Sequence, residues 1–370
     1  MTSAAESGAP PPPLGAGGPR QRRPAFLVGG MLLLVALTVW RFYFAAPAPA
    51  LVEVQGETMG TTYTVKVVAK TRQAQSDEAR ESLRALVQGE LDAVNAAMTT
   101  YDPRSELSRF NDGPAAVDVP LSAATIEVLA IALEVAAQTD GALDITVGPL
   151  VERWGFGASG PLQAPPSDDE LAALRAHVGI EHLVLDEAAA TLRKDHADTR
   201  VDLSAVAKGY AVDQVTEALR AQGYADGMVE VGGELRVFGK TEAGRAWRLA
   251  VERPSASERS VYEVLPLQDR AMATSGDYRN FTVVDGQRYS HTIDPRTGRP
   301  VTHALASVTV VADDCAHADA LATSLNVLGP ERGPELAASH DIAALFLVQQ
   351  RDGELAEVST SAYDALREAP

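Results

Sequence analysis

The spacing of apolar residues along the chain predicts a mixture of helices and strands. Residues 76–98, 121–138 and 206–222 carry apolar side chains every three or four positions, which is typical of helices with one buried face. Shorter runs that alternate apolar and polar residues, or are apolar throughout, predict strands. These runs are 61–68, 228–231, 234–238, 247–252, 272–274, 280–284, 306–311 and 342–348. The pattern predicts an α+β fold of mainly antiparallel strands with flanking helices, and not a doubly wound sheet.

Capping residues define where several of these helices begin and end. Ser122 is placed to cap the start of the second helix, and Gly223 is placed to end the third. Shorter helices are predicted over 168–177 and 314–328. No internal repeat is visible, so the pattern describes one domain rather than an array.

A long apolar run, residues 24–44, follows three arginines and is interrupted only by Arg41. About 20 helical residues at about 1.5 Å each reach roughly 30 Å, enough to cross a bilayer. Positive charge before the run predicts that residues 1–23, a disordered Pro-, Gly- and Ala-rich segment, stay in the cytoplasm. We therefore expect a single-pass anchor in the cytoplasmic (inner) membrane, a linker over 45–51, and a domain over 52–370 on the periplasmic (extracytoplasmic) side.

The same region bears on processing. Ala46-Pro-Ala-Pro-Ala50 contains Ala-x-Ala spacings that a signal peptidase recognises, although prolines make poor cleavage sites. An uncleaved anchor is the favoured interpretation, and cleavage stays open. Cys315 is the only cysteine, which excludes an internal disulfide and a lipid-modified cysteine after the apolar run.

Charge is distributed unevenly along the chain. The net charge is −18, and the first 46 residues hold four arginines and one glutamate, so the remainder carries −21. A domain of that charge repels phosphates over most of its surface, and we expect no nucleic-acid partner.

The stretch 201–211 carries the most informative chemistry. Apolar residues around Asp202 predict the end of a buried strand, a turn of small residues follows, and Lys208 opens the third helix. Such a turn lets backbone groups approach a ligand closely, while Lys208 neutralises phosphate and Asp202 accepts hydrogen bonds. The alternative is a surface ion pair that contributes little.

Asp319 and Thr323 lie four residues apart on a predicted helix, so both side chains point to one side. A carboxylate and a hydroxyl are hard oxygen donors that suit Mg²⁺. The alternative is an acid in the first turns of a helix beside an ordinary helical threonine.

The order and spacing of several segments resemble the FAD:protein FMN transferases of the ApbE family, from about Val52 to Val327. The segments that carry the resemblance are 56–62, 98–111, 142–150, 201–211, 273–281, 289–300 and 318–323. The resemblance implies an ApbE-like (T-fold-related) architecture, FAD as substrate and Mg²⁺ as cofactor.

The resemblance also implies which residues contact FAD. They are Met59, Tyr101, Ala142, Leu143, Asp144, Asp202, Lys208, Ser275 and Ile293. A polarizable Met59 suits the face of a flavin or adenine ring, and Tyr101 is placed to stack on the cofactor. Ser275, followed by a glycine, can present a hydroxyl and backbone N–H groups to a pyrophosphate. Trp154 is interpreted as a core residue.

For the metal, the resemblance implies that Asp319 and Thr323 bind Mg²⁺ together with the backbone carbonyl of Ala205. Family members often have a second acid three residues after the first. Ala322 stands there in this chain, so Asp313 or Asp314 is an alternative ligand.

His291 is the candidate catalytic base because its ordinary pKa near 6.5 suits proton transfer at neutral pH. A structural role for this histidine is the alternative. Asp294 is a second catalytic candidate, and its Asp-Pro-x-Thr-Gly setting equally predicts a capping role in a turn.

Together these residues predict a membrane-anchored, Mg²⁺-dependent transferase that moves FMN from FAD to a Thr or Ser of an acceptor protein and releases AMP. The resemblance implies that the acceptors are subunits of membrane redox complexes. Two alternatives stay open: an FAD pyrophosphatase that releases FMN and AMP, and a non-catalytic periplasmic FAD-binding protein.

Overall fold

The computed structural model describes residue 10 and residues 25–43, 47–158, 160–255, 260–276 and 281–368. The chain divides into two units, 1–47 and 48–370. In the first, α1 (Ala25–Tyr43) is a helix. Among the residues that the structure describes, no helix is both long and apolar enough to span a bilayer. The predicted disorder of 1–23 lies outside the described residues apart from Pro10, as do both ends of the predicted anchor, which stays a prediction.

The second unit is built on an eight-stranded sheet in which every neighbouring pair is antiparallel. In spatial order the strands are β1 (Ala50–Thr58), β2 (Thr61–Ala69), β6 (Gly227–Val231), β7 (Glu234–Phe238), β10 (Arg270–Gly276), β15 (Leu305–Ala312), β16 (Ala343–Gln349) and β17 (Leu355–Ser359). The predicted α+β class with mainly antiparallel strands is confirmed.

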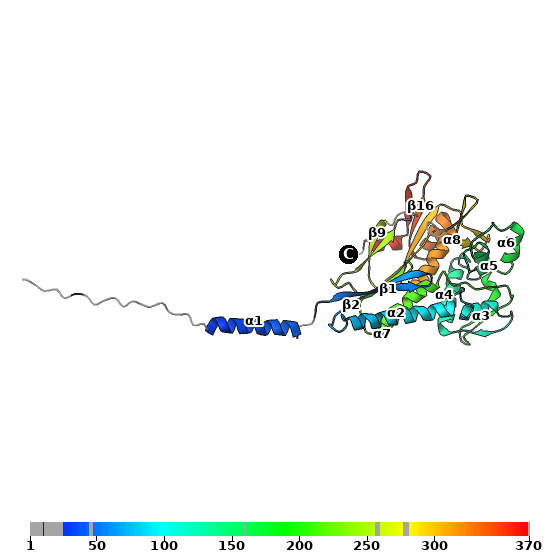
Figure 1. Ribbon diagram of the computed structural model, residues 1–370. Coiled ribbons are helices and arrows are strands. Elements are labelled where there is room, and N and C mark those ends of the chain that lie inside the picture. The colour runs from blue at the N-terminus through cyan, green and yellow to red at the C-terminus, as the bar shows by residue number, and fades with distance from the viewer. Residues whose placement is uncertain are drawn as a thin grey trace, which may run out of the picture. The chain divides into compact units, whose positions relative to one another are not determined.

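Helices cover one face of this sheet (Figure 1). α2 (Asp77–Met98), α7 (Ala207–Ala221) and α8 (Cys315–Ser339) contact the strands, and α4 (Ala123–Gln138) packs against α8. Their apolar faces and the inward residues of the strands form the main core. The buried face of α2 carries Leu83, Val87, Leu91, Val94 and Met98, which follows the helical spacing of the sequence.

The opposite face of the sheet is covered by the hairpin β8 (Trp247–Glu252) and β9 (Val261–Leu267) and by α9 (Ser361–Arg367). Trp247 and Tyr363 are its largest buried side chains. This layer forms a separate apolar cluster.

A third, smaller cluster lies under the loops that follow α4. It joins α5 (Gly148–Arg153) and α6 (Asp168–Arg175) to the short pair β13 (Ile293–Asp294) and β14 (Arg299–Pro300). Trp154 is buried there and donates from Nε1 to the Gly298 carbonyl at 2.8 Å. Its interpretation as a core residue is confirmed. The remaining elements are α3 (Glu106–Asp112), a 3₁₀ turn (Ile180–His182), β3 (Val119–Pro120), β4 (Leu183–Asp186), β5 (Thr191–Lys194), β11 (Phe281–Val284) and β12 (Gln287–Ser290).

Two details differ from the sequence-based expectation. No strand leads to Asp202: its backbone N–H donates to the Ile145 carbonyl at 2.7 Å in an irregular segment, so the predicted strand end is wrong. The apolar run is buried because it crosses the core between elements, not because it pairs in a sheet. The helix predicted to end at 328 continues as α8 to Ser339 across a kink at Gly329, where φ is 78°.

Candidate functional site

The N-terminal halves of α7 and α8 are joined by two buried carboxylates. Asp319 of α8 accepts a hydrogen bond from the Gly209 N–H of α7 at 3.1 Å. Asp213 of α7 accepts from the N–H groups of Cys315 and Ala316 at 2.9 Å each. The first N–H groups of a helix have no partner within the helix, so each carboxylate satisfies donors at the start of the other helix.

Gly209 permits this close approach. A Cβ atom at this position would lie 2.2 Å from the Cys315 carbonyl oxygen, a separation that real Cβ contacts do not reach. The absence of a side chain therefore lets the two helix starts touch and brings Asp319 to the backbone of α7.

Lys208 lies between two buried carboxylates. Its Nζ is 3.2 Å from Asp319 Oδ2 and 3.3 Å from Glu234 Oε1. Burial alone would lower the pKa of Lys208, but the charges of Asp319 and Glu234 raise it above its ordinary value. Two carboxylates therefore share one ammonium in a site where Asp319 is 4% and Glu234 5% exposed.

With two carboxylates and one ammonium in a buried site, the pKa values of both acids are raised. Burial raises the pKa of Glu234 to about 7, against the lowering effect of Lys208, and burial also raises the pKa of Asp319. Within the described part of the chain, Glu234 Oε2 is buried with no hydrogen-bond partner. The cluster therefore carries excess negative charge, which a proton on Glu234 or a cation beside Asp319 would neutralise.

The other two predicted metal-ligand atoms accept or donate no hydrogen bond within the described residues. Because the Gly209 N–H goes to Asp319, no backbone N–H of the described chain donates to the Ala205 carbonyl. The Thr323 hydroxyl, one turn after Asp319 on α8, makes no hydrogen bond within the described residues. A carboxylate, a hydroxyl and a carbonyl form an all-oxygen donor set that fits Mg²⁺. Of the alternative ligands, Asp314 is occupied as the cap of α8, accepting from the His317 N–H, and Asp313 pairs with Arg270.

The same face of α8 extends one turn further to Asn326, which is fully buried. Its Nδ2 lies 3.3 Å from Ser275 Oγ on β10 and 3.4 Å from the Thr292 Oγ1. Asn326 therefore joins two segments that are distant in sequence, and it brings the predicted Ser275 and the residue after His291 to the helix that carries Asp319. Residues 277–280, which follow Ser275, lie outside the described part of the chain.

The predicted catalytic residues differ in how they are held. The His291 ring is half-buried and lies edge-on to Phe156, with ring centroids 6.4 Å apart. Asp294 accepts from the backbone N–H of Arg296 at 2.9 Å and from its guanidinium at 2.8 and 2.9 Å. The Asp294 carboxylate thus holds a turn, which is the capping alternative that its sequence setting predicted.

Tyr101 and Met59, the two residues predicted to contact a ring of FAD, lie in separate parts of the fold. Tyr101 is 67% exposed, and its hydroxyl donates to the Phe156 carbonyl at 3.3 Å. Partial desolvation of the hydroxyl and the negative charge of Asp202 raise the pKa of Tyr101. Met59 occupies the two-residue β1–β2 turn, and its backbone φ is 47°. Residues other than glycine rarely adopt a positive φ. A methionine held in this conformation points to a use for its side chain.

Most of the remaining residues predicted to bind FAD can contact it only through backbone atoms. Ala142, Leu143 and Ile293 are 2%, 3% and 6% exposed, so their side chains belong to the core. Asp144 accepts from the Thr146 backbone N–H at 2.8 Å and from its hydroxyl at 2.6 Å, and burial raises its pKa. The Asp202 carboxylate accepts from the Ser204 N–H at 2.9 Å and so fixes the turn that carries Ala205.

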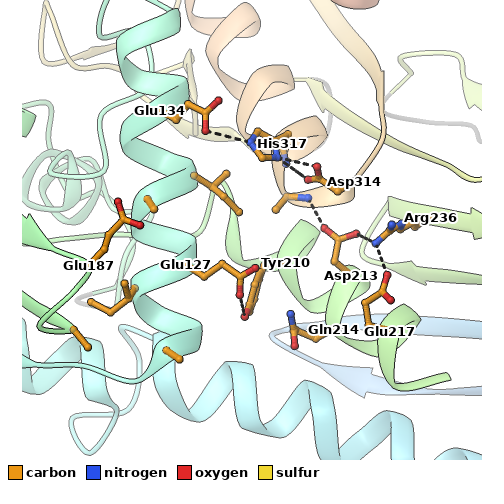
Figure 2. A pocket seen from close by; sticks show the side chains of 16 residues that line it. Glu127, Glu134, Glu187, Tyr210, Asp213, Gln214, Glu217, Arg236, Asp314 and His317 are labelled. Carbon is orange, nitrogen blue, oxygen red and sulfur yellow. Dashed lines mark hydrogen bonds and ion pairs between the residues drawn. The ribbon is translucent and has the colours of Figure 1, made fainter. Parts of the chain in front are cut away.

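A separate pocket of about 600 Å³ lies between α4, α7 and the start of α8 (Figure 2). Of the residues considered for the site, it is lined only by Asp314, the alternative metal ligand. Six of its polar side chains form three pairs: His317 with Asp314 at 2.8 Å, Asp213 with Arg236 at 2.9 Å, and Tyr210 with Glu127 at 2.8 Å. This pocket is the outer side of the helix junction, and its carboxylates hold the start of α8.

Sequence reasoning missed Glu234, Asn326 and the role of Gly209. Asn326 follows Asp319 by seven residues and lies on the same helix face, so extending the Asp319–Thr323 pattern by one turn would have found it. Glu234 follows two glycines at the start of a strand, where a carboxylate is normally exposed, and no local signal indicates its burial.

Comparisons with known proteins give one answer. Residues 59–346 match the model of the ApbE family. The FAD:protein FMN transferase of Vibrio cholerae is 44% identical over 321 residues, covering 86% of this chain and 94% of the relative. The FAD:protein FMN transferase of Escherichia coli (strain K12) is 38% identical over 303 residues, covering 80% and 84%.

Solved structures agree with the sequence comparisons. The flavin transferase ApbE from Vibrio cholerae has a TM-score of 0.78 at 43% identity and covers 86% of this chain and 99% of its own. The apo form of the flavinyl transferase ApbE from Pseudomonas stutzeri has a TM-score of 0.78 at 38% identity, covering 88% and 99%.

Proposed function

This chain belongs to the ApbE family and is an FAD:protein FMN transferase, and from that premise we propose the reaction and the residues that carry it. An acceptor Thr or Ser hydroxyl attacks the phosphorus of the FMN half of FAD. The new bond joins the acceptor oxygen to that phosphorus, the bond to the bridging pyrophosphate oxygen breaks, and AMP leaves. The hydroxyl proton passes to a base.

Mg²⁺ is the proposed cofactor, held by Asp319, Thr323 and the Ala205 carbonyl; when bound, it supplies charge neutralisation on the pyrophosphate. The observation that carries this proposal is the arrangement at the α7–α8 junction. Asp319 is buried and oriented by the Gly209 N–H, while the Thr323 hydroxyl and the Ala205 carbonyl are left without partners in the described chain. All three donors are oxygen atoms.

Lys208 and His291 have separate proposed tasks. Lys208, held at 3.2 Å from Asp319, places a fixed positive charge beside the predicted pyrophosphate position. Phosphoryl transfer depends mainly on positioning and charge neutralisation, which such a preorganised ammonium provides. His291 accepts the proton of the acceptor hydroxyl as the bond to phosphorus forms.

The flavin is held by the residues that border the site. Tyr101 supplies an exposed ring for stacking, and Met59 supplies a polarizable side chain at the β1–β2 turn. The backbone of 142–144, Asp202, Ser275 and the backbone at Ile293 complete the proposed contacts.

We further propose that residues 24–44 anchor the enzyme in the cytoplasmic membrane and that the domain acts on the periplasmic side on subunits of membrane redox complexes. The support is the charge before the apolar run. Two reporters fused after Pro49 test this topology, one that is active only in the periplasm and one that is active only in the cytoplasm. The topology predicts activity of the periplasmic reporter, and activity of the cytoplasmic reporter alone would contradict it.

The reaction is tested by incubating the full chain with FAD, Mg²⁺ and a flavin-free acceptor subunit of a membrane redox complex. Mass spectrometry follows the acceptor, and chromatography follows the small products. Transfer predicts an FMN adduct and one AMP for each adduct. Free FMN and AMP without an adduct would indicate a pyrophosphatase, and FAD bound but unchanged would indicate a storage protein. The same acceptor with its target Thr or Ser replaced by alanine serves as the control.

A further inference from the structure

Two imidazole rings from different segments of the domain stack on each other. His177 follows α6, and His196 lies in the turn after β5. Their ring centroids are 3.8 Å apart and the planes differ by 20°. Asp198 lies beside them, and one ligand atom of each of the three residues falls within 4.8 Å of the others.

One buried polar atom of this group has no partner. His177 Nδ1 is buried and has no hydrogen-bond partner within the described residues. The Asp198 carboxylate lies 3.9 Å from His196 Nδ1, beyond hydrogen-bond reach. His196 Nδ1 accepts a hydrogen bond from the Asp198 backbone N–H at 3.2 Å, so Nε2 is the nitrogen that His196 offers to a metal. A buried ring nitrogen without a partner is costly, so a ligand that uses its lone pair would stabilise the arrangement.

The backbone around these rings is held firmly. Lys194 is 1% exposed, and its Nζ donates to the carbonyls of Asn111, Ala197 and Thr199 at 2.6, 2.9 and 3.1 Å. The Thr199 hydroxyl in turn donates to the His177 carbonyl at 3.1 Å. One buried lysine therefore fixes the turn that carries His196 and Asp198, and a threonine ties that turn to His177.

We propose that His177, His196 and Asp198 bind a divalent transition metal, with Zn²⁺ as the test ion. Two imidazoles and a carboxylate suit Zn²⁺, whereas Mg²⁺ prefers oxygen ligands alone. Tetrahedral zinc with bonds of about 2.1 Å needs ligand atoms roughly 3.4 Å apart, whereas the ligand atoms of the three residues now lie within 4.8 Å of one another. Because the lone pairs of two stacked rings lie in nearly parallel planes, one ring must turn out of the stack before both histidines can face one metal. Water fills the fourth position.

The site shares no residue with the predicted FAD or Mg²⁺ contacts. Its effect is to join the end of α6 to the turn after β5, and it can be measured without following flavin transfer. A metal bound there is read out as stoichiometry, affinity and thermal stability of the folded protein.

The test is a Zn²⁺ titration of the full chain at neutral pH, after removal of metals with a chelator and with excess Mg²⁺ present to saturate oxygen sites. A chromophoric chelator that competes for zinc reports the affinity. His196→Phe is the key variant, because phenylalanine keeps a ring for stacking but offers no nitrogen. The His196 side chain is 46% exposed, so the fold should tolerate the change.

We expect the wild-type chain to bind one Zn²⁺ that His196→Phe binds at least tenfold more weakly, and Asp198→Asn to weaken binding as well. His182→Phe is the matched control. His182 Nδ1 pairs with Asp195 at 2.9 Å on the same hairpin but has no second histidine, so this variant should bind zinc as wild type does. The proposal is overturned if the wild-type chain takes up no zinc, if His196→Phe binds it equally well, or if His182→Phe loses it to the same extent.

Discussion

The backbone N–H of Gly209 donates a hydrogen bond to the Asp319 carboxylate over 3.1 Å, so the first turn of α7 positions a side chain of α8. The reverse contact, from Cys315 N–H to Asp213, holds the same junction from the other helix. Asp319 is therefore both a structural partner and the proposed metal ligand. A simple alanine substitution would leave Lys208 with one carboxylate fewer and disturb the fold as well as the site.

Met59→Gly tests whether the strained turn serves flavin binding. Glycine removes strain of about 1 kcal/mol but adds a similar cost through the freedom of the unfolded chain, so the free energy of unfolding should change by less than about 1 kcal/mol. Loss of the methionine–ring contact should weaken FAD binding roughly 2–10-fold. Fluorescence titration and thermal unfolding measure the two effects. Ala116→Gly, at another residue with positive φ, is the control that should leave FAD affinity unchanged.

Tyr101→Ala should weaken FAD binding about fivefold, because stacking of an aromatic ring contributes about 1 kcal/mol. The contact exists in the ground state and in the transition state alike, so the change should appear in KM and not in kcat. Tyr101→Phe keeps the ring and loses only the bond to the Phe156 carbonyl, and it should bind FAD nearly as wild type does. Equal affinities of the alanine and wild-type proteins would remove Tyr101 from the flavin site.

His291→Ala should leave FAD affinity nearly unchanged and lower kcat roughly 10²–10⁴-fold, as expected for loss of a general base. Single-turnover FMN transfer at saturating FAD measures the chemical step. If the variant loses FAD binding yet transfers at the wild-type rate once saturated, His291 is a cofactor contact. Asp294 is then the next candidate base, although its carboxylate is already bound to Arg296.

The stability of the helix junction should depend on pH through Asp213. Burial raises the pKa of Asp213 to about 6, and the bonds from Cys315 and Arg236 oppose this shift. The native state therefore holds the proton more tightly than the unfolded chain, and this contribution to stability falls as pH rises from about 4 to 6, by about 2 kcal/mol.

Urea unfolding at several pH values measures this slope. Asp213→Asn should flatten it between about pH 4 and 6. Glu217 also pairs with Arg236, but its side chain is 53% exposed. Glu217→Gln should therefore leave the slope unchanged. Identical slopes in Asp213→Asn and the wild-type chain would contradict the assignment.

The local elements were predictable because their signals are local. Ser122 and Ser76 cap α4 and α2 through their side chains, and the apolar spacing continues to the helix ends. The order of the eight strands was not, since pairs such as β2–β6 join segments about 160 residues apart and no short pattern encodes that choice.

In the candidate site, too, local features were predictable from the sequence and features that depend on tertiary contacts were not. Asp319 and Thr323 share a helix face, and that geometry follows from their spacing. The apolar residues around Asp202 predicted a strand because buried irregular segments and buried strands have the same composition. The burial of Glu234 beside Lys208 depends on tertiary contacts between β7 and α7, which neither segment reveals alone.

The most direct test of the account is the Mg²⁺ dependence of FMN transfer by Asp319→Asn. Asparagine keeps an acceptor for the Gly209 N–H but removes the charge that a metal requires. Asp314→Asn, at the cap of the same helix, is the matched control. Single-turnover formation of the FMN–acceptor adduct is followed by mass spectrometry at increasing Mg²⁺, with FAD affinity and thermal unfolding measured in parallel. We expect the wild-type and Asp314→Asn proteins to respond to Mg²⁺ and saturate, and Asp319→Asn to stay folded without Mg²⁺-dependent transfer. A wild-type rate from Asp319→Asn in the presence of Mg²⁺ would contradict the proposed centre.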